Sequence, residues 1–362
     1  MRGDRQEIGK SSQAADGAAE VGDRRVPADA LVIGAGPAGL AAAEALARAG
    51  HGVILAERMP SPGRKLLMAG KSGLNLAKDE PLEAQAARYG AAAGRMGPIL
   101  SAFGARGAAE LAEGLGQSVF TGSSGRVFPS AMKASPMLRA WLSRLEGMGV
   151  ELRRRWAWRS IEGGFTFDTP EGRVTVEAPR CVLALGGASW RRLGSDGAWA
   201  PLLAAKGVPI VRFEGANVGL RMDWSPHMDR HLGAPVKDVR LRAGDSAFHG
   251  EMVVSREGLE GGALYEVIPA VRGGAPLLLD LLPGRGAEAV AARLAAMPRK
   301  LSRPNRLRRL GLSPVKAALA MELGADDLKA VRVPHRGLRD MDEAISTAGG
   351  IAWAGLTEGL EL

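Results

Sequence analysis

The chain has little of what several classes of protein need. It contains one cysteine, Cys181, among 362 residues, so it can form no internal disulfide and suits a reducing compartment. No apolar run approaches the roughly 18 residues that a membrane-spanning helix requires. Cysteine and histidine residues also lack the spacing of a metal site. These absences predict a cytoplasmic protein with no membrane anchor and no metal ligands.

The first 27 residues are polar and lack the apolar segment of a signal peptide. Their five basic and five acidic residues cancel. We therefore expect a disordered leader over residues 1–27. The whole chain is longer than one hydrophobic core usually supports, so the remainder should form two or more domains.

The most informative stretch is Ala30–Glu57. An apolar strand runs into a G-x-G-x-x-G turn, which opens an alanine-rich helix that returns to a second apolar strand. We expect Gly34 to allow the tight turn, Gly36 to let a pyrophosphate approach, and Gly39 to let the helix lie close to the strand. Glu57 ends the second strand, 18 residues past Gly39, where ribose hydroxyls need an acceptor. This order predicts a dinucleotide-binding βαβ unit.

The segment after Glu57 is rich in glycine and cations, which can approach and face phosphate groups. A plain surface loop is the alternative, but its position behind the ribose acid favours a loop that wraps the cofactor. Three short β-type segments at 158–177 and an apolar strand ending in Gly-Gly come later. Together these elements supply the residues that we expect to bind the cofactor: Gly34, Gly36, Pro37, Ala38, Gly39, Glu57, Arg58, Gly63, Arg64, Lys65, Gly70, Gly73, Asn75, Trp158, Gly186 and Gly187.

The formal charge of +9 is concentrated in one region of the chain. Residues 285–310 carry eight arginines or lysines against the single acid Glu288. Such a cluster can face the phosphates of ribosomal RNA, here through Arg303, Arg306, Arg308 and Arg309, or it can be a solvated helix face. Both interpretations remain open from the sequence.

Several motifs together resemble one known family, that of the BaiN/RdsA-type NAD(P)/FAD-dependent oxidoreductases. The likeness runs from about residue 28 to the end of the chain. The matching motifs are V-I-G-A-G-P-A-G-L-A-A-A at 32–43, G-R-K-L-L-M-A-G-K-S-G-L-N-L at 63–76, G-S-S-G-R-V-F-P at 122–129, M-K-A-S-P-M-L-R-A-W-L at 132–142, A-L-G-G-A-S-W at 184–190, L-G-S-D-G at 193–197, G-L-S-P-V-K-A-A-L at 311–319 and A-I-S-T-A-G-G-I at 344–351.

The resemblance implies an α/β fold: a glutathione-reductase-like FAD-binding Rossmann domain with a β-barrel-like insert and a small helical insert. We place the first part of the FAD domain at 28–200, the β-rich insert at 201–284, the basic helical insert at 285–334 and the return segment at 335–362. The implied cofactor is FAD, with NAD(P)H as a transient electron donor. The implied reaction is reduction of a C=C bond in an unsaturated ring, such as a steroid dienone or a uridine of ribosomal RNA.

The chain departs from the family pattern in three places. Relatives carry G-R-C-N where this chain has residues 72–75, and Ser-Tyr-Pro where it has residues 189–191. A C-terminal G-E-x-x-D segment and a G-G-Y helix are also missing, so we expect a truncated FAD site. Two alternatives follow: an RNA-binding flavoprotein scaffold, or an inactive truncated flavoprotein.

The sequence identifies no catalytic residue. The hairpin motif Gly125–Pro129 either lines the substrate side of the site or is structural, and the sequence favours neither. His227, His231, His249 and His335 lack a recognisable pattern of partners.

Overall fold

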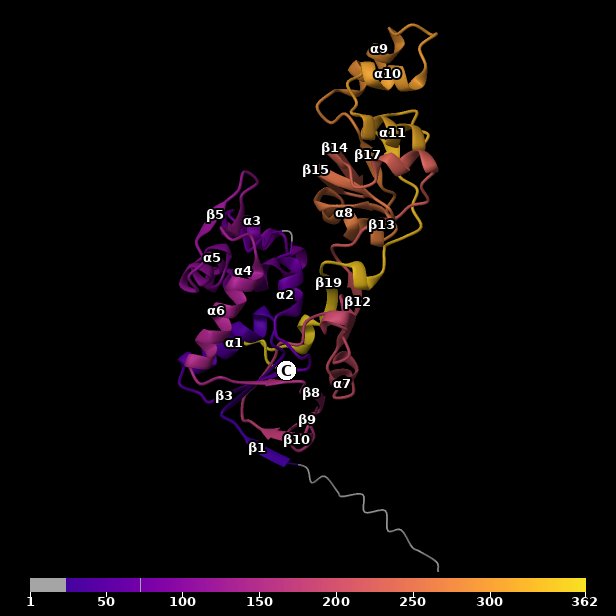
Figure 1. The fold of residues 1–362 in the computed structure, drawn as a ribbon. Helices are drawn as coiled ribbons and strands as arrows, with labels where there is room; N and C mark the ends of the chain where they lie inside the picture. Colours follow the sequence, from indigo (N-terminus) through magenta and orange to yellow (C-terminus); the bar gives the residue numbers. More distant parts are fainter. Residues whose placement is uncertain (1–23, 72) are drawn as a thin grey trace, which may run out of the picture.

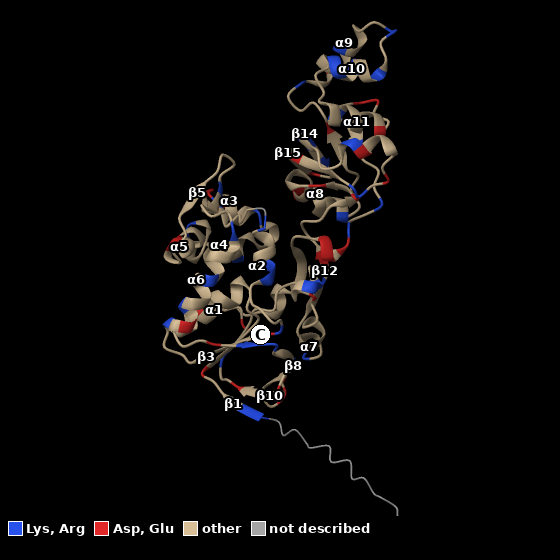
Figure 2. Ribbon diagram, viewed as in Figure 1, with Lys and Arg blue, Asp and Glu red and all other residues tan. Residues whose placement is uncertain are grey.

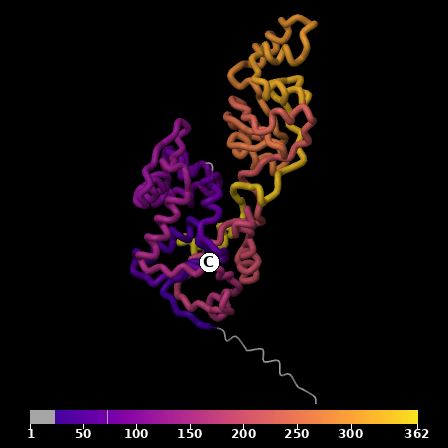
Figure 3. Tube along the Cα trace, viewed as in Figure 1, coloured from indigo at the N-terminus to yellow at the C-terminus, as the bar shows by residue number. Residues whose placement is uncertain are grey.

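The computed structural model describes residues 24–71 and 73–362, which form two lobes (Figures 1 and 3). Residues 1–23 of the expected leader lie outside the described residues. Its last four residues are not part of a leader, because Arg24–Pro27 forms strand β1 and pairs in parallel with β10 (Gly172–Glu177). The folded part of the chain therefore includes residues that the sequence assigned to the leader.

A parallel sheet of four strands lies at the centre of the first lobe. Its order is β11 (Cys181–Leu183), β2 (Ala30–Ile33), β3 (Val53–Glu57) and β7 (Glu151–Arg154). Helices α1 (Pro37–Arg48) and α6 (Ala134–Gly147) pack on one face, and an antiparallel layer of β10, β9 (Phe165–Thr169) and β8 (Ala157–Ser160) covers the other.

The alternation of side chains along β2 explains this layered arrangement. Val32 is buried among the residues of the helical face, whereas Leu31 and Ile33 are buried on the opposite face with Phe167 of β9. Because both faces of this parallel sheet are covered, the sequences of its central strands are continuously apolar. The predicted α/β Rossmann fold is confirmed.

The rest of the first lobe consists of short elements around this core. They are α2 (Arg64–Ala69), β4 (Ala77–Lys78), α3 (Leu82–Ala87), the 3₁₀ turn Gly90–Ala92, α4 (Ala93–Ala102), α5 (Ala105–Gly114), β5 (Val119–Thr121), β6 (Arg126–Pro129), the 3₁₀ turn Arg191–Leu193 and α7 (Ala200–Ala204). Strands β4, β6 and β5 form a small antiparallel sheet.

Two antiparallel strands connect the lobes. The chain leaves the first lobe through β12 (Ile210–Gly215) and returns through β19 (Thr347–Ile351), which pairs with it. After a 3₁₀ turn at Trp353–Gly355, the C-terminus lies beside the first lobe (Figure 1). The return strand thus brings the end of the chain back to the parallel sheet.

The second lobe is built on a six-stranded antiparallel sheet. Its order is β13 (Leu220–Arg221), β16 (Gly258–Glu260), β15 (Ser246–Ser255), β14 (Pro235–Ala243), β17 (Leu278–Asp280) and β18 (Val331–Arg332). The segment after β18 bonds back to β13: the Arg221 amide donates to the Gly337 carbonyl and the Arg339 amide to the Gly219 carbonyl, both at 2.9 Å. Since this joins the two edges of the sheet, the predicted β-barrel-like insert is confirmed.

Helices cover this barrel and extend beyond it. Helix α8 (Gly262–Arg272) packs on β14 and β15, and the core around it is buried. The other helical segments are Pro226–His231, α9 (Ala287–Ala295), α10 (Arg303–Arg309), α11 (Pro314–Glu322) and Met341–Glu343. Helices α9 and α10 form the far tip of the lobe, where lysines and arginines gather (Figures 1 and 2).

Among residues 24–71 and 73–362, no helix combines the length and apolar character needed to cross a bilayer. The same residues contain no group of three or more histidine, cysteine, aspartate or glutamate side chains that could hold a metal ion.

Candidate cofactor site

A cavity of about 440 Å³ lies at the carboxyl ends of β2 and β3. This is the edge at which parallel α/β sheets bind ligands, because the loops and helix N-termini converge there. Eleven of the sixteen residues expected to bind the cofactor line it: Gly34, Gly36, Pro37, Glu57, Arg58, Gly63, Arg64, Lys65, Trp158, Gly186 and Gly187. Residues far apart in sequence are therefore brought to one place.

The other five expected residues do not line the cavity. Gly39 is buried beneath the turn, where a Cβ atom would lie 1.7 Å from the Gly34 carbonyl oxygen. Gly70 packs against α6, since its Cβ would lie 2.5 Å from that of Ala134. The last three lie elsewhere on the lobe: Ala38 and Asn75 are exposed, and Gly73 lies beside Met132.

The glycine-rich turn has the geometry that its pattern predicts. Gly34 adopts φ +104°, and a Cβ there would lie 2.3 Å from the Ala184 carbonyl oxygen, so only glycine fits. A Cβ on Gly36, by contrast, would meet no heavy atom within 4 Å. Gly36 therefore opens onto the cavity at the N-terminus of α1, whose free amides and dipole favour an anion.

Glu57 fixes the turn from the end of β3. Its Oε2 accepts the Ala35 amide at 2.9 Å, and its Oε1 accepts the Met59 amide at 2.7 Å. A carboxylate has about four acceptor positions. Glu57 therefore holds the loop in place, lines the cavity and keeps unused acceptor positions.

Arg58 ties the same strand end to the loop at 194–196. Its guanidinium donates to Asp196 Oδ2 at 2.7 Å and to the Gly194 carbonyl at 2.8 Å. Burial raises the pKa of Asp196, but the hydrogen bonds from Arg58 and from the Ala198 amide outweigh it, and the net pKa lies below the usual value. Asp196 is thus held as a carboxylate at the wall of the cavity.

Two polar atoms in the cavity lining have no partner. Arg64 Nε and Ser195 Oγ are buried, and neither makes a hydrogen bond within the described residues. Leaving such atoms unsatisfied costs roughly 1–3 kcal/mol each, so they point to a polar ligand that completes the site. These residues fit a group such as FAD, which carries phosphate and hydroxyl oxygens.

A second connection runs from Lys65 to the return strand. Lys65 Nζ donates to Ser189 Oγ at 2.6 Å, and Ser189 Oγ also accepts from Thr347 Oγ1 at 3.2 Å. Gly187 permits this approach, because a Cβ there would lie 2.7 Å from Thr347 Oγ1. Burial lowers the pKa of Lys65.

The sequence interpretation missed several residues of the lining. They include Trp156, Ser195, Asp196 and Trp199. The motif L-G-S-D-G at 193–197 could have indicated Ser195 and Asp196, because it contains both residues and closely follows the Gly-Gly turn.

Two other features of the first lobe lie outside the cavity lining. The motif Gly125–Pro129 contains β6, pairs with β4 and β5, and does not line the cavity. Burial raises the pKa of the Cys181 thiol to about 12, which keeps it protonated and agrees with a packing role.

The four arginines expected to face RNA behave differently from one another. Arg303 donates to the Ala325 carbonyl, and Arg306 donates to the carbonyls of Leu301 at 3.1 Å and Arg299 at 2.9 Å. Arg308 and Arg309 are exposed. Arg308 also donates to Asn305 Oδ1 at 2.9 Å, so three of the four make hydrogen bonds within the chain.

Comparison with known proteins places the chain in a family. A family model described as the HI0933-like protein Rossmann domain matches residues 28–360. A solved 3-ketosteroid-Δ4-(5α)-dehydrogenase from Rhodococcus jostii RHA1, in complex with 4-androstene-3,17-dione, is 16% identical, with 92% of this chain and 86% of that chain covered and a TM-score of 0.45. The open conformation of a flavocytochrome c3 fumarate reductase is also 16% identical, with 91% and 67% covered and a TM-score of 0.47. THI4 of Thermovibrio ammonificans is 16% identical, with 57% and 71% covered and a TM-score of 0.32.

These structures are distant, and their likeness does not extend to a substrate. The family model, in contrast, spans nearly the whole chain, from the first strand of the Rossmann unit to the return segment. The chain belongs to the HI0933-like family, the FAD-dependent oxidoreductases of the BaiN/RdsA type that its motifs resemble.

Proposed function

We propose that this protein is a reductase that transfers a hydride to a C=C bond of an unsaturated ring, with electrons from NAD(P)H, and that FAD occupies the cavity at the ends of β2 and β3. The observation that carries the proposal is the pair of unpartnered buried atoms, Arg64 Nε and Ser195 Oγ, in the same lining as the glycine-rich turn. The single cysteine supports a reducing compartment such as the cytoplasm.

Each part of the cavity suits one part of the cofactor. The pyrophosphate would lie against Gly36 and the N-terminus of α1, with Arg64 supplying positive charge. Glu57 would accept the ribose hydroxyls with its remaining acceptor positions. Arg58 holds the loop that carries Ser195 against this end of the cavity.

The chemistry that FAD would supply when bound is hydride transfer, and that chemistry belongs to the cofactor. The protein supplies orientation and charge. Lys65 holds a proton on Nζ beside Ser189, and its lowered pKa makes that proton easier to release than that of an exposed lysine. We propose that NAD(P)H binds transiently, because the sequence has no second G-x-G-x-x-G unit.

A pair of glycine variants tests the cofactor site. In Gly36→Ala the added methyl group enters the open cavity, so we expect FAD affinity to fall at least tenfold. The stability of the FAD-free protein should change by less than about 1 kcal/mol, as for other substitutions at a helix N-cap. Gly97→Ala in α4 is the matched control, because its Cβ also meets nothing within 4 Å but lies away from the cavity.

FAD occupancy of the two purified variants, measured by absorbance after heat release, gives the result. Equal occupancy in Gly36→Ala and Gly97→Ala would contradict this placement of FAD. The reaction is tested separately: NADH or NADPH should bleach the flavin of the holoprotein without oxygen, and a cyclic dienone should restore it with loss of one C=C bond. Reoxidation by oxygen alone would contradict the proposed reduction.

A further inference from the structure

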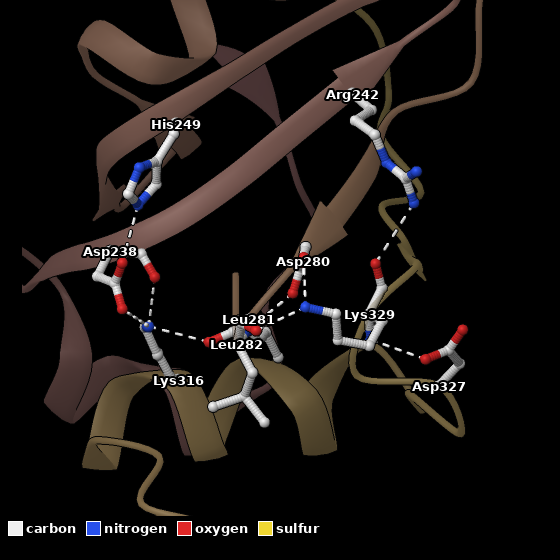
Figure 4. Close-up of polar contacts among 9 residues, drawn as sticks. All are labelled: Asp238, Arg242, His249, Asp280, Leu281, Leu282, Lys316, Asp327 and Lys329. Carbon is white, nitrogen blue, oxygen red and sulfur yellow. Dashed lines mark hydrogen bonds and ion pairs between the residues drawn. The ribbon is translucent and has the colours of Figure 1, made fainter. Parts of the chain in front are cut away.

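A second hollow, of about 590 Å³, lies in the other lobe. Figure 4 shows four of the residues that line it, with their polar contacts: Arg242, Asp280, Asp327 and Lys329. It is formed by β14, the end of β17, the loop that leads into α9, and the segment at 327–330. We call it the insert pocket and define it by its charged residues, Arg240, Arg242, Asp280, Arg285, Asp327 and Lys329. The insert pocket is separate from the cofactor cavity and shares no residue with it.

Positive charge exceeds negative charge in this pocket. Four cationic side chains and the carboxylates of Asp280 and Asp327 line it. Both carboxylates are already engaged: Asp280 pairs with Lys329 Nζ at 2.8 Å and accepts the Leu282 amide, while Asp327 accepts the Lys329 amide at 2.7 Å. Within the described residues, none of the three arginines forms an ion pair with either carboxylate, and the four cations outnumber the two acids.

The arginines keep most of their donors free. Arg242 makes one long contact of 3.5 Å to the Lys329 carbonyl, and Arg285 donates to the Leu310 carbonyl. The guanidinium of Arg240 makes no hydrogen bond or ion pair within residues 24–71 and 73–362. A guanidinium has five N–H donors, so most remain available to a ligand.

The backbone arranges these groups around one space. Arg240 and Arg242 project from the same face of β14, because Leu241 between them is fully buried in the barrel. Helix α9 begins at Ala287 after Gly286, which provides no side-chain cap, so its first amides stay free. A Cβ on Gly284 or Gly286 would meet no heavy atom within 4 Å, so this wall of the pocket is open.

We propose that the insert pocket binds a phosphate group. Arginine forks match phosphate oxygens in a bidentate manner, and a helix N-terminus adds amides and the positive end of its dipole. The phosphate can belong to a free nucleotide or to a nucleic-acid strand, since both present the same group. This inference is independent of the proposed reduction, because it concerns the other lobe.

The test uses the full-length holoprotein and inorganic pyrophosphate, titrated by calorimetry at low ionic strength. We expect saturable binding at one site, and at least tenfold weaker binding in Arg240→Gln/Arg242→Gln. The matched control is Arg256→Gln, an exposed arginine between β15 and β16 that does not line the pocket. It should bind pyrophosphate within twofold of the unaltered protein, and FAD content should be unchanged in every variant.

A single variant, Arg240→Gln, guards against loss of folding in the double variant, because the exposed Arg240 side chain makes no hydrogen bond or ion pair within the described chain. Absence of saturable binding, or equal weakening by Arg256→Gln, would overturn the proposal. ADP and a short single-stranded oligonucleotide then distinguish the source of the phosphate. If ADP or the oligonucleotide binds more tightly than pyrophosphate and is displaced by pyrophosphate, that probe identifies the class of ligand. If pyrophosphate displaces neither probe, the proposal is also overturned.

Discussion

Lys65 Nζ donates a hydrogen bond to Ser189 Oγ at 2.6 Å, and this hydroxyl also accepts a bond from Thr347. The Ser189 hydroxyl thus joins helix α2 to β19, the strand that returns from the second lobe. Ser189 is fully buried, so the connection is shielded from water. The bond therefore couples three segments that are distant in sequence: α2, the Gly-Gly turn and β19. The placement of the return strand depends on a residue that also lines the cofactor cavity.

Replacing Lys65 with methionine should loosen this junction. Ser189 would lose one of its two donors and keep only the longer bond from Thr347, so we expect faster amide hydrogen exchange in β19 and weaker FAD binding. Burial lowers the pKa of Lys65 from the usual 10.5. The unfolded chain therefore binds more protons between the lowered value and 10.5, and stability rises with pH across that window.

In Lys65→Met this rise should be smaller than in the unaltered protein, as measured by chemical unfolding over a range of alkaline pH. Lys71→Met is the control, because Lys71 is exposed on the same loop. A hydrogen-exchange pattern in Lys65→Met that matches the control would show that the bond does not hold β19.

The Arg58–Asp196 pair predicts a response to acid. Because the net pKa of Asp196 lies below its usual 3.8, its contribution is present above about that pH and is lost as pH falls through the folded-state value. Arg58→Ala removes the main stabilising donor. We expect a loss of about 0.5–1 kcal/mol near neutral pH, a modest value since both side chains are partly exposed.

The difference in unfolding midpoint between the unaltered protein and Arg58→Ala should shrink as pH falls below about 3.8, because only the unaltered protein still has the stabilised Asp196 carboxylate to lose. Arg106→Ala breaks a more exposed ion pair with Glu110 in α5 and serves as the control, with almost no effect expected. Identical acid profiles for Arg58→Ala and Arg106→Ala would contradict the coupling between β3 and the loop at 194–196.

The sequence predicts the Rossmann unit well because its determinants are local. Gly39 is required by its contact with the Gly34 carbonyl within a single βαβ unit, Gly34 adopts a positive φ in the turn of that unit, and Glu57 lies at a fixed distance along it. A pattern of adjacent residues therefore contains nearly all of the information. The same reasoning succeeds for the cavity lining at Gly186 and Gly187, which follow the neighbouring strand β11.

Interactions between distant segments were not predictable in this way. Nothing near Arg24 in the sequence indicates that it begins a strand, because its partner β10 lies about 150 residues further on. Gly70 looks like a cofactor-binding glycine, but its small size is needed for contact with Ala134. Ser195 lines the cavity, and the loop that carries it is held at the end of β3 by the bond from Arg58 to the Gly194 carbonyl. A contact between such distant segments cannot be inferred from the sequence around Ser195.

The basic helix α10 gives the last prediction, because its arginines divide into two kinds. Arg303 and Arg306 donate to backbone carbonyls outside α10, and such bonds contribute about 1 kcal/mol or more each to stability. Arg308→Ala/Arg309→Ala should change stability by no more than about 0.5 kcal/mol, since both side chains are exposed. Arg303→Ala/Arg306→Ala should lower the unfolding free energy of the second lobe by roughly 2 kcal/mol. Hydrogen exchange in α10 and α11 measures this difference without interference from the first lobe. If the two double variants exchange alike, the four arginines form one solvated face, and the carbonyl contacts contribute nothing to the lobe.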